Sequence, residues 1–327
     1  MPLPSTDVSW WCPLPDLGLV VFEGADAAAF LQGQLSSDVA ALAPGRGQWT
    51  SYNSPKGRVL ANAWLWRSPG GERFQALVAA DLAELVAKRL AMFVLRAKVR
   101  VVDATGAHRL FGIGGGDPAA VAASSLGAAP APRHAGGASR AAAELVTLPD
   151  GRIVVIASEP AAEFVADALA ASAGPPPPAA RWAAADIAAG VPWITAATSD
   201  AFVLQMLNLD ALDAVSFQKG CYPGQEVVAR TRYLGRLKER MFALHADAPA
   251  PAAGTRLFSP VFGDQPCGTV VGAAAASVRG SDLLAVVQLA AAGAPGLALG
   301  APDGPPLAVR TLPYALPEPT APRGRVG

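Results

Sequence analysis

Cysteine is scarce in this chain of 327 residues, which holds only Cys12, Cys221 and Cys267, together with three histidines. Three cysteines cannot form a complete set of disulfides, and their spacing does not match a metal-binding motif. The sequence therefore argues against a disulfide scaffold or a zinc ribbon. We expect no bound metal, and we expect a reducing, cytoplasmic compartment.

Long apolar runs are also missing, although hydrophobic residues make up 52% of the chain. No run approaches the about 18 to 20 apolar residues that a membrane span requires. The first sixteen residues, MPLPSTDVSWWCPLPD, lack the basic start and apolar core of a signal peptide. No membrane partner is expected.

Charge of either sign is not in excess, because 26 basic residues balance 26 acidic ones. A balanced chain is not built to bind nucleic acid directly. Residues 219–240 differ, with six basic side chains against two acidic ones, a local net charge of +4. The basic members are Lys219, Arg230, Arg232, Arg236, Lys238 and Arg240. This strip could receive an anionic small molecule, or it could be an ordinary solvated helix face.

Short strand-like runs alternate irregularly with helical segments, which predicts an α+β fold rather than a doubly wound parallel sheet. The runs 49–52 and 59–66 flank a Pro-Lys-Gly turn and are typical of a hairpin. A Pro-rich connector near 174–179 interrupts the body, which we place at 1–238. Residues 239–316 contain short strands between Gly/Pro turns, which predicts a small β-barrel or sandwich. The tail at 317–327 is expected to be disordered.

The most informative segment is Lys219–Arg230, which reads KGCYPGQEVVAR. Of the three cysteines, Cys221 alone has polar neighbours, and it precedes a predicted helix start. A helix N-terminus favours an anion, and Lys219 acts in the same direction, so both would lower the pKa of the thiol. Gly220 and Gly224 would let the backbone approach a ligand closely. The alternative is a Gly/Pro turn in which Cys221 is a small buried filler.

The segment resembles the KGCYxGQE signature of the YgfZ-type folate-binding proteins, which are relatives of the glycine-cleavage T-protein, an aminomethyltransferase. Two further segments support the resemblance: FLQGQLSSDV at 30–39 is similar to the family's opening helix, and SPKGR at 54–58 to its NPKGR turn. The similarity runs from about Leu17 to Tyr314.

The resemblance implies a folate-binding body of two ferredoxin-like lobes followed by a C-terminal β-barrel. It also implies tetrahydrofolate or a derivative as the ligand, with Cys221 as the reactive thiol assisted by Lys219. The residues expected at the folate site are Trp182, Leu17, Tyr222, Gln225, Glu226, Arg230, Arg232 and Arg236. The first two align with tryptophans that contact folate in the family, and the arginines would meet the glutamate tail.

Two departures from the family weaken the folate site. Leu17 stands where the family has a tryptophan, so it supplies contact area without a π-face. Ala188 stands where the T-protein branch has a glutamate that binds the pterin edge. A missing charge-assisted hydrogen bond is worth about 1.5 to 3 kcal/mol. Folate binding is implied, in a weakened or rearranged form.

Three functions are consistent with these residues. By resemblance, the first is an accessory protein for iron–sulfur cluster assembly or repair and, through those enzymes, tRNA modification; its partners would be iron–sulfur proteins or their assembly factors. The second is a folate-dependent aminomethyl or one-carbon transferase, which needs a catalytic aspartate. Asp81 is the nearest candidate, but a helix N-cap explains it better. The third is a non-catalytic scaffold that has lost folate binding.

Overall fold

The computed structural model describes residues 8–127, 136–138, 143–233 and 237–317. The chain divides into two compact units that interleave along the sequence. Unit 1 comprises Met1–Gln32, Asp38–Gln48 and Ala63–Trp182, and unit 2 comprises Gly33–Ser37, Trp49–Asn62 and Ala183–Gly327. The predicted boundary at residue 238 stays a prediction, and residues 318–327 of the predicted tail lie outside the described part.

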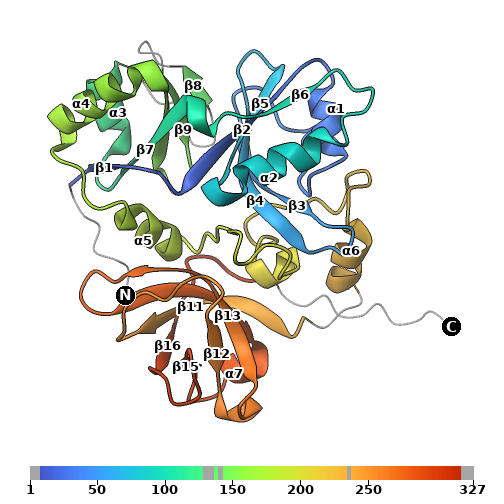
Figure 1. Cartoon of the computed structure of the whole chain (residues 1–327), viewed down its shortest axis with the longest axis vertical. Coiled ribbons are helices and arrows are strands. Elements are labelled where there is room, and N and C mark those ends of the chain that lie inside the picture. The colour runs from blue at the N-terminus through green and yellow to red at the C-terminus, as the bar shows by residue number, and fades with distance from the viewer. Residues whose placement is uncertain (1–7, 128–135, 139–142, 234–236, 318–327) are drawn as a thin grey trace. The chain divides into compact units, whose positions relative to one another are not determined.

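Unit 1 contains an antiparallel five-stranded sheet in the order β1-β7-β10-β9-β8. Its strands are β1 (Trp10–Pro13), β7 (His108–Gly114), β8 (Gly136–Ala138), β9 (Ala143–Thr147) and β10 (Ile153–Ser158). Helices α3 (Pro118–Leu126) and α4 (Ala162–Ala173) pack against each other and cover one face of this sheet (Figure 1). Their apolar sides join the sheet in one buried cluster that includes Ile113, Val155 and Leu169.

The second five-stranded sheet has the order β3-β4-β5-β2-β6. Its strands are β2 (Leu17–Glu23), β3 (Gly47–Asn53), β4 (Val59–Arg67), β5 (Arg73–Ala79) and β6 (Arg100–Asp103). Helix α1 (Ala27–Gln32) follows β2, and α2 (Ala80–Ala91) packs on β2 and β6. Strands β3 and β4 each run from one unit into the other. They flank the turn at 54–57, as the sequence predicted.

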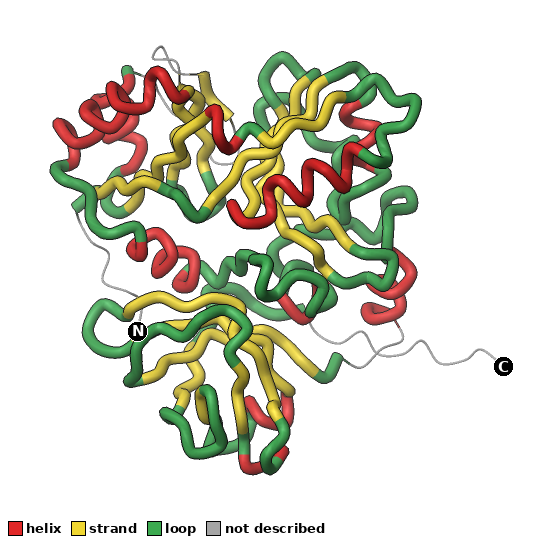
Figure 2. Tube along the Cα trace, viewed as in Figure 1, coloured by secondary structure: helices red, strands yellow, loops and turns green. Residues whose placement is uncertain are grey.

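The C-terminal part of unit 2 is a six-stranded antiparallel sheet in the order β15-β12-β13-β14-β11-β16, curled like half a barrel (Figure 2). Its strands are β11 (Glu239–Ala246), β12 (Arg256–Phe258), β13 (Pro266–Ala275), β14 (Ser281–Gln288), β15 (Ala298–Leu299) and β16 (Leu307–Arg310). A register shift between Val270 and Gly272 helps the sheet to bend. Its concave side buries Leu244, Leu283 and neighbouring apolar residues, with α7 (Leu289–Ala292).

The remaining described helices are α5 (Ala180–Ala188), α6 (Gln225–Tyr233) and the 3-10 turns η1 (Thr105–Ala107), η2 (Glu159–Ala161), η3 (Leu204–Leu207) and η4 (Pro260–Phe262). The α+β fold predicted from the sequence is confirmed. The predicted N-cap at Asp81 is wrong: α2 begins at Ala80 after Ala79, and Asp81 lies inside the first turn, where a carboxylate still favours the helix dipole.

Candidate functional site

Lys219 fixes the start of the KGCYPGQE loop in unit 2. Its ammonium nitrogen donates to the carbonyl oxygens of Leu35 at 2.6 Å and Ser37 at 2.7 Å. The same nitrogen lies 5.3 Å from the centre of the Tyr222 ring, within range of a cation–π contact. Two backbone acceptors and one aromatic ring therefore anchor a side chain that the sequence assigned to the thiol and to the basic strip.

Gly224 lets the loop lie directly on the turn at 54–57. Its φ is +79°, and a Cβ placed there would come within 2.5 Å of the Ser54 carbonyl oxygen and of the Gly57 Cα. Gly57 faces Val227 of α6 in the same way, with φ +73°. The close approach predicted for Gly224 is thus made to the protein's own backbone. At Gly220, by contrast, no atom of the described residues other than its chain neighbours lies within 4 Å of such a Cβ.

Cys221 is an exposed, free thiol between these two anchor points, whereas Cys12 and Cys267 are buried. Helix α6 begins at Gln225, four residues later. Because the dipole effect falls off within the first turn, the helix acts on Cys221 less than the sequence suggested. The alternative in which Cys221 is a buried filler does not fit its exposure. What the geometry offers is a surface thiol on a loop whose two ends are held.

Tyr222 points its ring into the protein next to this exposed thiol. The residue is 6% exposed, and its hydroxyl has no hydrogen-bond partner among the described residues. Burial raises the pKa of Tyr222 to about 12. A buried hydroxyl of this kind is a candidate for a ligand contact, because buried polar groups are nearly always paired.

Because burial raises the pKa of both Tyr222 and Tyr314, we expect the free energy of unfolding to fall at alkaline pH. Burial likewise raises the pKa of Tyr314 to about 12, against the lowering effect of its hydrogen bond with Asn208. In the unfolded chain a tyrosine titrates near about 10. The unfolded state therefore loses these protons first, and the stability present below about pH 10 should be lost as the pH rises toward 12.

Urea unfolding at a series of pH values measures this effect. Replacing both tyrosines by phenylalanine should flatten the fall in unfolding free energy above about pH 10. Tyr233→Phe is the matched control, since it removes a phenol from a residue that is 47% exposed rather than buried. An identical alkaline slope in the wild type and the double variant would show that the two phenols titrate normally.

The basic strip predicted at 219–240 is only partly available to a ligand. Glu226 and Arg230 form an exposed ion pair at 2.8 Å one turn apart on α6. The Arg232 guanidinium lies 4.4 Å from the centre of the Phe217 ring. Gln225 donates to the Lys219 carbonyl at 3.5 Å, which ties the helix start to the loop. Arg236 lies outside the described residues.

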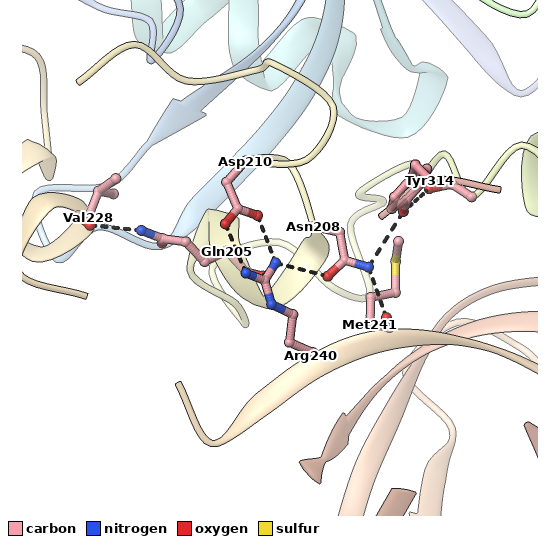
Figure 3. Close-up of polar contacts among 8 residues, drawn as sticks. Gln205, Asn208, Asp210, Val228, Arg240, Met241 and Tyr314 are labelled. Carbon is pink, nitrogen blue, oxygen red and sulfur yellow. Dashed lines mark hydrogen bonds and ion pairs between the residues drawn. The ribbon is translucent and has the colours of Figure 1, made fainter. Parts of the chain in front are cut away.

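Arg240, counted in that strip, belongs to a buried network (Figure 3). Its guanidinium meets the Asp210 carboxylate in a two-point contact, at 2.7 and 2.9 Å, and also donates to the Gln205 carbonyl. The Gln205 amide in turn donates to the Val228 carbonyl of α6 at 2.7 Å. Asn208 donates to the Met241 carbonyl of β11. The network therefore joins the motif helix to the curled sheet within unit 2.

Trp182 lies in unit 1, at the start of α5. It is 4% exposed, and the Arg152 guanidinium lies 4.2 Å from the centre of its ring. Arg152 is held by Asp150 at 2.6 Å and donates to the Trp182 carbonyl at 3.4 Å. Gly112 of β7 leaves room for the indole, because a Cβ there would come within 2.3 Å of two ring carbons. The indole nitrogen is buried and has no partner among the described residues.

The other predicted folate positions differ in their surroundings. Leu17 is a buried residue of β2 in unit 1. Ala188 is exposed at the end of α5, and as an alanine it offers no carboxylate to a ligand. The neighbouring Asp186 is buried and accepts a hydrogen bond from the Trp193 indole at 2.9 Å. The structure thus brings the motif together with 35–37 and 54–57 in unit 2, and Trp182 together with Arg152 in unit 1.

Sequence reasoning missed Arg152, Gly112 and the acceptors at Leu35 and Ser37. These partners are distant in sequence: Leu35 and Ser37 act through backbone carbonyls that any residue type carries, and Gly112 acts by having no side chain. Only the pairing of Arg152 with Asp150, two residues apart, offered a local signal. Among the described residues, no group of three or more His, Cys, Asp or Glu could hold a metal ion. No helix in the described part is long and apolar enough to cross a membrane.

Comparison with known proteins places these features in a family. The chain is 33% identical over 258 residues to the tRNA-modifying protein YgfZ of Photorhabdus laumondii, covering 78% of this chain and 75% of the relative. It is also 33% identical over 260 residues to the tRNA-modifying protein YgfZ of Yersinia pestis, covering 78% and 76%. No family model matches the chain.

The fold has a counterpart among solved structures. The glycine cleavage system aminomethyltransferase T of Bartonella henselae superposes with a TM-score of 0.75 at 17% identity, covering 95% of this chain and 87% of that one. At this identity the likeness shows the fold alone: the chain has the fold of the aminomethyltransferase T proteins. Sequence identity over three quarters of each chain goes further, and by that measure the protein belongs to the YgfZ family of tRNA-modifying proteins.

Proposed function

We propose that this protein is a folate-binding accessory factor for iron–sulfur cluster assembly or repair, and that it supports tRNA modification through the enzymes it serves. The observation that carries the proposal is the exposed Cys221 thiol on a loop anchored by Lys219 and Gly224. An accessible thiol can react with a partner, whereas a buried one is inert. Its partners are iron–sulfur proteins or their assembly factors.

Each unit holds a buried polar atom that is a candidate contact for a folate ligand. The Trp182 indole nitrogen in unit 1 and the Tyr222 hydroxyl in unit 2 are donors without a partner among the described residues. A reduced pterin offers acceptor atoms and a flat face, so these residue types fit the group. Arg152 holds the Trp182 ring in place. Arg232 and Arg230 remain the candidates for the glutamate tail, and Glu226 is the candidate carboxylate in place of Ala188.

Replacing Cys221 by alanine tests the thiol. In cells that lack the native protein, this variant should fail to restore an iron–sulfur tRNA-modifying enzyme, measured as the amount of modified nucleoside in digested tRNA. The free energy of unfolding should change by less than about 0.5 kcal/mol, because the side chain is exposed. Iodoacetamide should label Cys221 in the native protein and leave the buried Cys267 unlabelled; burial also raises the pKa of Cys267. Full restoration by Cys221→Ala would show that the thiol is not the reactive group.

Titration with tetrahydrofolate, followed by tryptophan fluorescence, tests the ligand. Binding with a change in emission is expected for the wild type and should be lost in Trp182→Leu. An unresponsive wild type would favour the scaffold that has lost folate. Turnover of an aminomethyl donor would instead favour the transferase.

A further inference from the structure

The segment that follows α2 exposes three large apolar side chains in four residues. Met92 is 66% exposed, Phe93 is 51% exposed and Leu95 is 89% exposed. The buried side of α2 is supplied by other residues, among them Leu82, Val86 and Leu90. Single exposed apolar residues need no explanation, but a group of three indicates a contact surface.

This segment is held in one conformation rather than left loose. Leu95 has φ +45°, a left-handed conformation that a residue with a bulky side chain rarely adopts. The chain then returns to the sheet: the Lys98 amide donates to the Asp26 carboxylate at 2.7 Å, and Ala97 donates to the Val94 carbonyl at 2.8 Å. The surrounding backbone therefore maintains a conformation that turns Leu95 outward.

Basic residues flank the apolar group on both sides in the sequence. Between residues 84 and 103 there are five basic side chains and two acidic ones, a net charge of +3 in a chain whose total is zero. The exposed basic members beyond α2 are Arg96, Lys98 and Arg100. No side-chain ion pair involves these three within the described ranges 8–127, 136–138, 143–233 and 237–317.

Carboxylates close to this segment already have partners. Asp26 accepts the Lys98 backbone amide, and Asp103 accepts the Thr105 backbone amide. Glu84 pairs with Lys88 across one helical turn. Glu23, opposite Arg100 in the β2–β6 register, pairs with Arg73 at 3.3 Å. The three cations beyond α2 are therefore available to an external anion.

We propose that the surface formed by residues 88–100 binds RNA, with the cations on phosphates and Phe93 stacked on an unpaired base. Arginine and lysine side chains beside an exposed aromatic ring are the combination that single-stranded or looped RNA requires. This goes beyond the proposed function, in which tRNA is reached only through other enzymes. It differs from the expectation of no direct nucleic acid, which rested on the charge of the whole chain and stays a prediction.

The test uses the full-length protein and fluorescently labelled bulk tRNA, with the dissociation constant measured by polarisation at several salt concentrations. Each lost phosphate contact reduces the slope of log affinity against log salt by about 0.7 to 0.9. Arg96→Gln combined with Lys98→Gln should therefore reduce the slope by about 1.5. Phe93→Ala should weaken binding by about five- to 150-fold and leave the slope unchanged.

Arg279→Gln combined with Arg310→Gln is the matched control, since it removes the same charge from exposed positions of unit 2. Equal losses in the test and control pairs would mean diffuse electrostatic binding and would overturn the assignment. Binding to vesicles containing phosphatidylglycerol, but not to tRNA, would make this a membrane surface. Absence of binding to either would leave a protein partner as the occupant and would also overturn the RNA inference. Loss of in-cell function in Cys221→Ala is independent of all these outcomes.

Discussion

Replacing Arg240 by leucine should lower the free energy of unfolding by about 3 to 5 kcal/mol. The Arg240 and Asp210 side chains are only 11% and 5% exposed, and they meet in a two-point contact (Figure 3). Removing the guanidinium leaves a buried carboxylate without its counter-charge. It also removes a donor to the Gln205 carbonyl. Urea unfolding measures the loss.

The matched control is Arg230→Leu. The Arg230 and Glu226 side chains also form an ion pair, at 2.8 Å, but they are 68% and 83% exposed. Removing this pair should therefore cost at most about 1 kcal/mol. Arg240→Lys keeps the charge and loses the fork geometry, so it should fall between the two. Replacing Arg240 and Asp210 together by leucine should cost less than Arg240→Leu alone, because no unpaired charge remains. Equal small losses in Arg240→Leu and Arg230→Leu would contradict a buried pair.

The effect should reach the motif as well. Gln205 links the same network to the Val228 carbonyl, so loosening η3 also loosens the anchorage of α6. Arg240→Leu is therefore expected to increase amide hydrogen exchange in α6 relative to the wild type. Arg230 lies on α6 itself but outside the network. Arg230→Leu should therefore not increase amide hydrogen exchange in α6 beyond local fraying.

Local sequence signals predicted the local structure of this protein. The turn at 54–57 was predictable because proline and glycine restrict the backbone within a few residues. The strands of the C-terminal sheet were predictable for the same reason, since Gly/Pro turns separate them. Gly224 was singled out as a close-approach glycine, but its neighbour proved to be the 54–57 turn, which no local pattern could identify.

Long-range partners explain what could not be predicted. Lys219 binds backbone carbonyls 184 and 182 residues away, and a carbonyl has no residue signature. Arg240 looked like one more member of a basic strip, because its partner Asp210 lies 30 residues earlier. The N-cap of α2 was predicted at Asp81, two residues after the observed N-cap Ala79, since helix ends depend on tertiary packing as much as on capping types.

Replacing Gly112 by alanine should displace Trp182 and so test the indole's role directly. The added methyl would come within 2.3 Å of two carbons of a ring that is 4% exposed, so the ring or the strand must shift. Overpacking of this kind costs about 1 to 3 kcal/mol. We expect that loss in urea unfolding, together with a weaker response of tryptophan emission to tetrahydrofolate.

Gly106→Ala is the control, because a Cβ there would meet no atom of the described part within 4 Å beyond its chain neighbours, and its φ does not fall in the left-handed region. A double-mutant cycle separates the clash from general damage: Gly112→Ala and Trp182→Leu together should cost less than the sum of the single changes, since the smaller side chain makes room for the methyl. Additive losses would mean that the two residues do not touch. If the two changes are non-additive in unfolding free energy while Gly112→Ala leaves the tetrahydrofolate titration unchanged, Trp182 is a core residue. Folate recognition must then rest on Tyr222 and the other motif residues of unit 2.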